Sequence, residues 1–222
     1  MSKNNTRAVI WDMDGVIADT APSHLKAWQE VFVKRGVRFT EEDFKDSFGL
    51  RNDTIIRKVL GEGISQDEIS SVADEKEENF RLRIRRGLEP LPGVIRLMRL
   101  LAEHDFMMAL ASSAPMENIR LLTGSLGIDN FFQCVISEKD VTEGKPSPQG
   151  FLLAANNLGV KPRNCIVIED AVAGVIAAKK AGMQCLAVTN THPKMRLTDA
   201  DFIVDTLEAV TVNNLEGLLN RS

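Results

Sequence analysis

The chain has 222 residues, of which 44% are hydrophobic and 26% are charged, and its formal net charge is -4. A chain of this length buries roughly 70% of its unfolded surface, so it forms a core without disulfides or structural metals. The mild acidity argues against a dedicated nucleic-acid binder, which would carry a basic patch. A small anionic substrate stays possible, because a phosphate site needs only a few cations and backbone N–H groups.

The cysteines and the N-terminal segment indicate a reduced, membrane-free environment. Cys134, Cys165 and Cys185 are widely spaced and lie among apolar residues, which predicts buried thiols rather than a disulfide framework or a zinc site. Residues 1–11 carry no signal-peptide core, and no membrane span follows them. We therefore expect a cytoplasmic protein without a membrane partner, and nothing requires more than a monomer.

Short apolar runs of strand length recur along the chain, over 8–11, 107–111, 135–136, 165–168, 186–188 and 202–204. Such uninterrupted runs are typical of strands buried on both faces of a parallel sheet. Apolar residues at helical spacing predict helices between them, over 94–104, from 116 onward, and over 147–158 and 173–181. This alternation predicts an α/β fold with a doubly wound, Rossmann-like parallel sheet.

Residues 20–88 break the alternation, because they contain helical patterns only, over 23–35, 41–47, 53–60 and 66–86. In the last pattern, acidic and basic residues at helical spacing, such as Glu77 and Arg81, indicate a solvated helix face. An insertion directly after the first strand would overhang the carboxyl end of that strand, where α/β sheets bind ligands. We predict a catalytic core formed by 1–19 and 89–222 and a small helical cap domain formed by 20–88.

Two acidic residues, Asp12 and Asp14, follow the first apolar run. In an extended backbone their side chains leave the same face, and a bound divalent cation would relieve their repulsion. The alternative interpretation is a turn at the end of the strand, for which Gly15 frees the backbone. The motif alone does not decide between a site and a turn.

Polar residues also follow other apolar runs. Ser112 and Ser113 end the run 107–111, where hydroxyl and N–H groups before a helix can hold phosphate. Glu169 and Asp170 follow the run that ends at residue 168, and a small set of oxygen ligands there favours Mg²⁺. Helix capping is the alternative for both pairs.

Lys145 lies in the segment Gly144-Lys145-Pro146, whose Gly and Pro would hold the lysine on a rigid loop. A solvated surface lysine is the alternative interpretation when this residue is considered alone. Considered together, the polar residues would meet at the carboxyl ends of four predicted parallel strands, which indicates one shared site.

This arrangement resembles the haloacid dehalogenase-like hydrolase superfamily, in its β-phosphoglucomutase-like branch with a helical cap, over essentially the whole chain. Segments 12–20, 111–113, 145–146 and 169–170 are similar to its four motifs. The resemblance implies that Asp12 attacks phosphorus and that Asp14 is the general acid/base. It also implies phosphate binding by Ser112, Ser113 and Lys145, and a Mg²⁺ cofactor held by Asp12, the backbone carbonyl of Asp14, Glu169 and Asp170.

The cap residues carry the choice of substrate. By resemblance, His24 and Lys76 lie near the acid/base and the sugar, and Arg51 could bind a second phosphate, although its match is offset by one residue. For His24, a structural role on its helix is the alternative. Related mutases tend to carry polar residues where this chain has Ala114-Pro115-Met116.

We therefore expect a phosphatase that hydrolyses a small phosphorylated metabolite, with sugar phosphates the preferred class, through an aspartyl-phosphate. The first alternative is a β-phosphoglucomutase that isomerises a phosphosugar through a bisphosphate. A non-catalytic regulatory protein of the same fold is the second alternative. The acidic pair and Lys145 suit phosphorus and Mg²⁺ better than a carbon–halogen bond.

Overall fold

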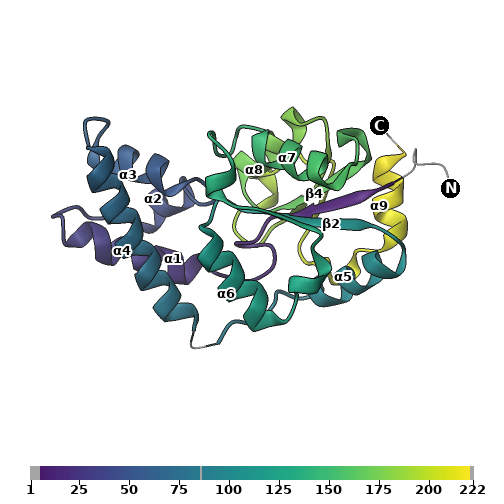
Figure 1. Ribbon diagram of the computed structural model, residues 1–222, viewed down its shortest axis with the longest axis horizontal. Helices are drawn as coiled ribbons and strands as arrows, with labels where there is room; N and C mark the ends of the chain where they lie inside the picture. Colours follow the sequence, from purple (N-terminus) through teal and green to yellow (C-terminus); the bar gives the residue numbers. More distant parts are fainter. Residues whose placement is uncertain (1–5, 86, 221–222) are drawn as a thin grey trace.

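The computed structural model describes residues 6–85 and 87–220 and shows one sheet covered by helices on both faces (Figure 1). Its six strands lie in the order β3-β2-β1-β4-β5-β6, and every neighbouring pair is parallel. The strands are β1 (Ala8–Trp11), β2 (Met107–Ala111), β3 (Cys134–Ile136), β4 (Cys165–Glu169), β5 (Gln184–Val188) and β6 (Phe202–Val204). The predicted doubly wound parallel sheet is confirmed.

Helices on the two faces explain the uninterrupted apolar runs. Every residue of β1 and β4 is buried, because one apolar cluster packs below the sheet and a second packs above it (Figure 1). The first cluster involves α5 (Val94–Glu103), α6 (Met116–Leu126) and α9 (Val212–Leu219), and the second involves α7 (Gln149–Leu158) and α8 (Val172–Lys180).

The last helix, α9, was missed by the sequence analysis. Its start carries a local signal, a capping box in which Thr211 Oγ1 accepts from Asn214 N and the Asn214 side chain accepts from Thr211 N. Short 3-10 turns lie in the connections at η2 (Asp129–Phe131), η3 (Glu138–Asp140), η4 (Pro162–Asn164), η5 (Lys194–Arg196) and η6 (Leu207–Ala209).

The register of the central strands aligns their carboxyl ends. Trp11, the last residue of β1, lies opposite Leu110 of β2 and Ile168 of β4. The residues that follow these three strands therefore emerge together at one edge of the sheet. The chain order also reverses beside β1, since β2 lies on one side of it and β4 on the other, and ligands bind at such a reversal.

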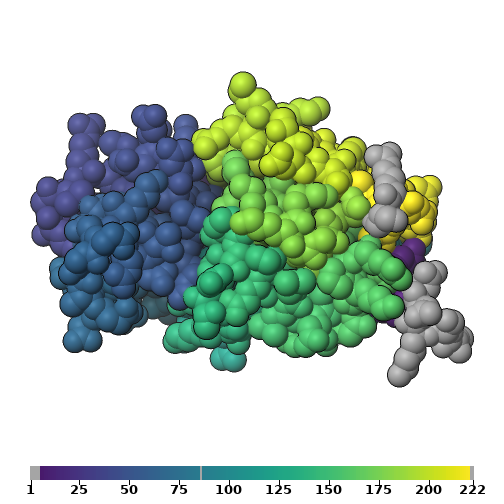
Figure 2. All heavy atoms as spheres, turned by 90° about the horizontal axis from the view of Figure 1, so that it is seen from above, coloured from purple at the N-terminus to yellow at the C-terminus, as the bar shows by residue number. Residues whose placement is uncertain are grey.

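Four helices form a separate unit beside the carboxyl edge of the sheet (Figures 1 and 2). They are α1 (Ala21–Val33), α2 (Glu41–Lys45), α3 (Asn52–Leu60) and α4 (Gln66–Ile84). They enclose an apolar cluster of their own, which includes Trp28 and Phe32. The chain enters and leaves this unit side by side, because Ala18 forms a bridge with Pro90.

Within the described ranges, no helix is both long enough and apolar enough to cross a lipid bilayer.

The apolar cluster of the four-helix unit offers a test of what stabilises it. Phe32 is fully buried and stacks on Trp28 with 5.0 Å between ring centroids, whereas the next residue, Val33, is 67% exposed. We expect Phe32→Ala to lower the free energy of unfolding by about 3–5 kcal/mol, through the lost contacts and the cavity. Val33→Ala should change it by less than about 0.5 kcal/mol. Urea denaturation followed by tryptophan fluorescence measures both, and equal losses would contradict this assignment of the cluster.

Candidate active site

A buried lysine joins two carboxylates at the carboxyl edge of the sheet. Asp12 follows β1 directly, and its backbone N–H donates to the carbonyl of Ile168 at 3.0 Å. Lys145, from the loop before α7, donates through Nζ to the carboxylates of both Asp12 and Glu169. The structure thus brings together Asp12, Lys145 and Glu169 as predicted from the sequence, and Lys145 is not a solvated surface residue.

The charged groups at this edge of the sheet shift each other's pKa values. Burial raises the pKa of Asp12 to about 8, and the charges of Glu169 and Asp14 add to this rise, while Lys145 opposes it. Burial alone would lower the pKa of the Lys145 ammonium, but the charges of Asp12 and Glu169 outweigh burial and raise it. Asp12 therefore lies among more negative charge than one lysine balances, and a further cation would keep it ionised.

Three carboxylates have room to share such a cation. Asp12, Glu169 and Asp170 are buried, and each offers an oxygen within 4.8 Å of the others. Asp170 Oδ2 is buried and makes no hydrogen bond of ordinary geometry among residues 6–85 and 87–220. Burial, with the charges of Glu169 and Asp12, raises the pKa of Asp170 well above its usual range, although its contact with the Thr191 hydroxyl favours the ionised form and opposes this rise. A buried acceptor without a partner is costly, so this all-oxygen donor set fits a hard divalent cation.

Glu169 also organises the backbone that follows β4. Its Oε2 accepts hydrogen bonds of 2.7 Å from the N–H groups of Asp170 and Ala171. The capping alternative is therefore partly realised, by Glu169 acting on amides that precede α8. Gly174 makes room for this carboxylate, because a Cβ there would lie 1.7 Å from Glu169 Oε1.

The two serines after β2 have different partners. Ser112 Oγ accepts from the N–H of Ala114 at 3.1 Å, and Ser112 lines a hollow together with Lys145. Ser113 Oγ donates to the carbonyl of Gly49, in the four-helix unit, at 2.9 Å. The cap position of α6 is Pro115, so helix capping does not account for Ser112.

The side chain of Asp14 turns away from the other carboxylates. Its Oδ1 accepts from Thr20 Oγ1 at 2.6 Å and lies 3.1 Å from His24 Nε2. Burial would raise the pKa of Asp14, but the charge of His24 and the hydrogen bonds from His24 and Thr20 outweigh it and lower that pKa. Its side chain is outside the group of three carboxylates, and metal binding by its backbone carbonyl stays a prediction.

Thr20 was not identified from the sequence as a functional residue. It lies six residues after Asp14 and directly before α1, where a threonine is expected as a helix cap. Its hydroxyl instead donates to Asp14, which no local pattern indicates.

His24 and Lys76 face the same hollow between the four-helix unit and the core, which Asp14 also lines. The His24 ring stacks on Phe80 of α4 at a centroid distance of 3.8 Å. Lys76 Nζ donates to Glu77 Oε1 at 2.6 Å. Both residues lie near the acid/base candidate.

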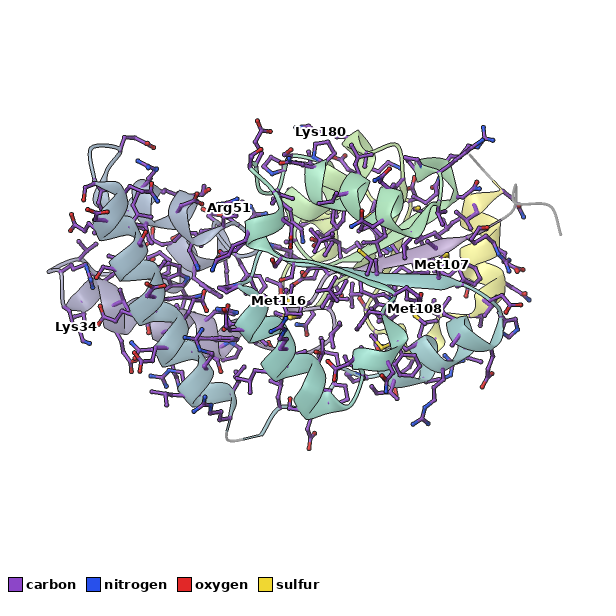
Figure 3. All side chains as sticks on the ribbon, in the orientation of Figure 1. Lys34, Arg51, Met107, Met108, Met116 and Lys180 are labelled. Carbon is purple, nitrogen blue, oxygen red and sulfur yellow. The ribbon has the colours of Figure 1, made fainter. Side chains whose placement is uncertain are left out.

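Arg51 lies where the four-helix unit meets the core (Figure 3). Its guanidinium donates to the backbone carbonyls of Glu138 at 3.2 Å and Val141 at 2.9 Å, and it pairs with Asp53 at 3.2 Å. These contacts give Arg51 a role in holding the unit against the core loop that leads to Lys145. Arg51 also lines the hollow that Ser112 and Lys145 line, and its contact with a second phosphate stays a prediction.

The predicted solvated face of α4 is wrong at Glu77. This residue is 4% exposed, because α4 packs against α6 of the core, where the Asn118 side chain donates to Glu77 Oε2. Arg81 in turn donates to Asn118 Oδ1 at 3.1 Å. The helical spacing of Glu77 and Arg81 was identified correctly, but their common partner lies on another helix.

A parallel α/β sheet with carboxylates and a lysine at its carboxyl edge, beside an inserted helical unit, defines a class of phosphoryl-transfer enzymes. Residues 9–188 match the family model of haloacid dehalogenase-like hydrolases. The chain belongs to this family, as its motifs indicated.

Its relatives include phosphatases and a phosphomutase. The fructose-1-phosphate phosphatase YqaB of Escherichia coli is 32% identical over 180 residues, covering 81% of this chain and 95% of that protein. The β-phosphoglucomutase of Bacillus subtilis is 30% identical over 217 residues, covering 94% and 93%. A crystal structure of β-phosphoglucomutase from Clostridium difficile matches with a TM-score of 0.90 and 27% identity, covering 97% and 98% of the two chains. The protein is thus an enzyme of the phosphatase and phosphomutase group.

The space that Gly174 leaves for Glu169 can be tested with a matched pair of helical glycines. Gly174→Ala would drive a methyl group into the Glu169 carboxylate, so we expect a loss of about 1–3 kcal/mol in unfolding free energy. Gly217, in α9, has open space around its Cβ position, and Gly217→Ala should be neutral or stabilising by up to about 1 kcal/mol. Urea denaturation gives both values, and two effects of the same sign would refute this packing argument.

Proposed function

We propose that the protein is a Mg²⁺-dependent phosphatase that hydrolyses small phosphomonoesters, with sugar phosphates as its preferred class, through an aspartyl-phosphate on Asp12. The observation that carries this proposal is the separation of two carboxylates only two residues apart. Asp12 pairs with Lys145 in the acidic cluster, whereas Asp14 pairs with Thr20 and His24. Two carboxylates in different environments suit two different catalytic roles.

In the first half of the reaction, a carboxylate oxygen of Asp12 attacks phosphorus and the bond to the leaving oxygen breaks. Lys145 balances the negative charge on the transferring phosphoryl group, and Ser112 and the nearby backbone N–H groups hold its oxygens. When bound by Asp12, Glu169, Asp170 and the backbone carbonyl of Asp14, Mg²⁺ supplies the electrostatic screening that allows one anion to approach another.

Asp14 acts as the general acid and then the general base in the two halves of the reaction. A bound phosphate dianion beside Asp14 raises its pKa, which favours the protonated form that donates to the leaving oxygen. In the second half, Asp14 takes a proton from water as that water attacks phosphorus, and the bond from phosphorus to Asp12 breaks. Thr20 and His24 orient the Asp14 carboxylate for these transfers.

We assign the choice of leaving group to residues 20–88, as a cap domain over the carboxyl edge of 1–19 and 89–222. The hollow beside Asp14 has mixed walls, since His24 and Lys76 offer polar groups while Ala114 of the core does not. We favour hydrolysis over isomerisation because a mutase must also bind a second phosphate, for which Ala114 offers no polar group. The likeness to a relative named as a fructose-1-phosphate phosphatase supports sugar phosphates as the substrate class.

Isomerisation of a phosphosugar is the second candidate. It is supported by the match to a β-phosphoglucomutase over 94% of this chain. The two candidates share the first half of the reaction and differ in what attacks the aspartyl-phosphate, which is water in one and a sugar hydroxyl in the other.

The activity test follows the products. With Mg²⁺, we expect the enzyme to release inorganic phosphate from fructose 1-phosphate and from β-glucose 1-phosphate. Asp12→Asn removes the nucleophile and should lower turnover by about 1,000-fold or more. Asp67→Asn, the same change at an exposed position in α4, should leave turnover within about twofold.

The same assay, with catalytic β-glucose 1,6-bisphosphate added, separates the candidates. Glucose 6-phosphate formed without matching phosphate release would replace hydrolysis by isomerisation. Turnover by Asp12→Asn equal to that of the unmodified enzyme would overturn both.

The proposed metal site is tested by measuring Mg²⁺ binding, without an activity assay. Asp170→Asn leaves the buried site short of one carboxylate, so we expect Mg²⁺ affinity in isothermal titration calorimetry to fall by about tenfold or more. Asp199→Asn, at an exposed position, should bind Mg²⁺ as the unmodified protein does. Unchanged affinity in Asp170→Asn would exclude the proposed cluster as the metal site.

A further inference from the structure

The hollow between the four-helix unit and the core contains a lysine and a histidine, and each lies against a carboxylate. Its described lining includes Asp14, His24, Lys76 and Glu77. His24 lies against Asp14 at 3.1 Å, and Lys76 lies against Glu77 at 2.6 Å. The hollow therefore offers no net positive charge to a ligand.

Lys76 is buried, and its ammonium group is surrounded by contacts within the four-helix unit. It is 2% exposed, donates to Glu77 Oε1 at 2.6 Å and to Asn52 Oδ1 at 3.4 Å, and lies 5.0 Å above the ring of Trp28. A buried ammonium is tolerated only with a counter-charge. Glu77 supplies that charge, and the Trp28 face adds a weaker attraction.

Glu77 is itself fixed from both sides of the boundary between the two units. Asn52 Nδ2, from α3, donates to Glu77 Oε1 at 2.8 Å, and Asn118, from α6 of the core, donates to Glu77 Oε2. Burial would raise the pKa of Glu77, but the charges of Lys76 and His24 and its hydrogen bonds outweigh burial and lower it. The carboxylate therefore stays ionised at neutral pH and cannot swing away from Lys76 without breaking these bonds.

No other described residue beside this hollow supplies the positive charge that Glu77 neutralises on Lys76. The core contributes Asp14, Ser113 and Ala114 to this hollow, and none of them is a cation. Arg51, at the boundary nearby, is committed to Asp53 and to two backbone carbonyls. A second phosphate placed here would meet the Glu77 carboxylate before it met an uncommitted cation.

We propose that Glu77 is a specificity-determining residue: by holding Lys76 in a buried ion pair, it makes this hollow select a neutral, hydroxyl-bearing leaving group and reject one that carries a second phosphate. Asn52 and Lys76 both line the hollow, and the Lys76 ammonium has a third donor left for a hydroxyl, while the aromatic rings beside them can pack on the apolar face of a sugar. The inference deepens the proposed phosphatase function and rests on it.

The test compares fructose 1-phosphate with fructose 1,6-bisphosphate, by phosphate release with Mg²⁺. The ratio of kcat/KM for the bisphosphate to that for the monophosphate should be low in the unmodified enzyme. Glu77→Gln keeps the shape but frees the Lys76 charge, so we expect this ratio to rise by about tenfold or more, mainly through a lower KM for the bisphosphate. Glu78→Gln, the same change at the adjacent exposed position, should leave the ratio unchanged.

The double variant Lys76→Gln with Glu77→Gln removes the pair as a unit and leaves no lone buried charge, so it stays informative even where Glu77→Gln alone fails to fold. Its ratio should equal that of the unmodified enzyme, because a neutral pair has been replaced by neutral groups. A selective loss of bisphosphate turnover in the double variant would show that Lys76 grips a second phosphate, and would overturn the inference.

Two further outcomes separate this inference from the function it rests on. If the unmodified enzyme is active and the kcat/KM ratio is the same in a folded Glu77→Gln variant, only the role of Glu77 is overturned. A merely structural residue would lower both activities in parallel and leave this ratio unchanged. An unmodified enzyme that releases no phosphate from either sugar overturns the phosphatase function, and the inference with it.

Discussion

The structure depends on one electrostatic constraint, the gathering of carboxylates at the carboxyl edge of a buried parallel sheet. Asp12, Glu169 and Asp170 cannot all stay ionised there without cations. Lys145 satisfies part of this need by donating to Asp12 and Glu169, and the remaining excess of negative charge is what suits the edge to a divalent cation and to phosphoryl transfer. Ligands that are left incompletely paired in this way are suited to a bound cation.

The same rule applies to the hollow between the four-helix unit and the core, with the opposite result. There each carboxylate already has a partner, since Asp14 faces His24 and Glu77 faces Lys76. The carboxyl edge of the sheet therefore needs a further cation before it can hold a charged phosphate, whereas the hollow under the helices is electrically balanced. Under the proposed function, this division would place the phosphate of a phosphomonoester at the sheet and its neutral part under the helices.

Close approach of backbone and side chain makes this charge arrangement possible. A Cβ on Gly15 would lie 1.9 Å from Asp170 Oδ2, and one on Gly174 would lie 1.7 Å from Glu169 Oε1. Gly15 also adopts a φ of +83°, which other residues rarely take. The two glycines therefore serve the acidic cluster directly, because any side chain at either position would displace a carboxylate.

The amino-acid sequence by itself determined the strands, the edge at which they end and the group that meets there. Apolar runs such as 8–11 and 165–168 report burial on both faces, and polar residues directly after them must emerge at the carboxyl edge. Only the tertiary structure decided the partners of Thr20, Arg51 and Glu77. Periodicity describes the faces of one helix, but it does not say which faces meet, so the burial of Glu77 became visible only when α4 packed against Asn118.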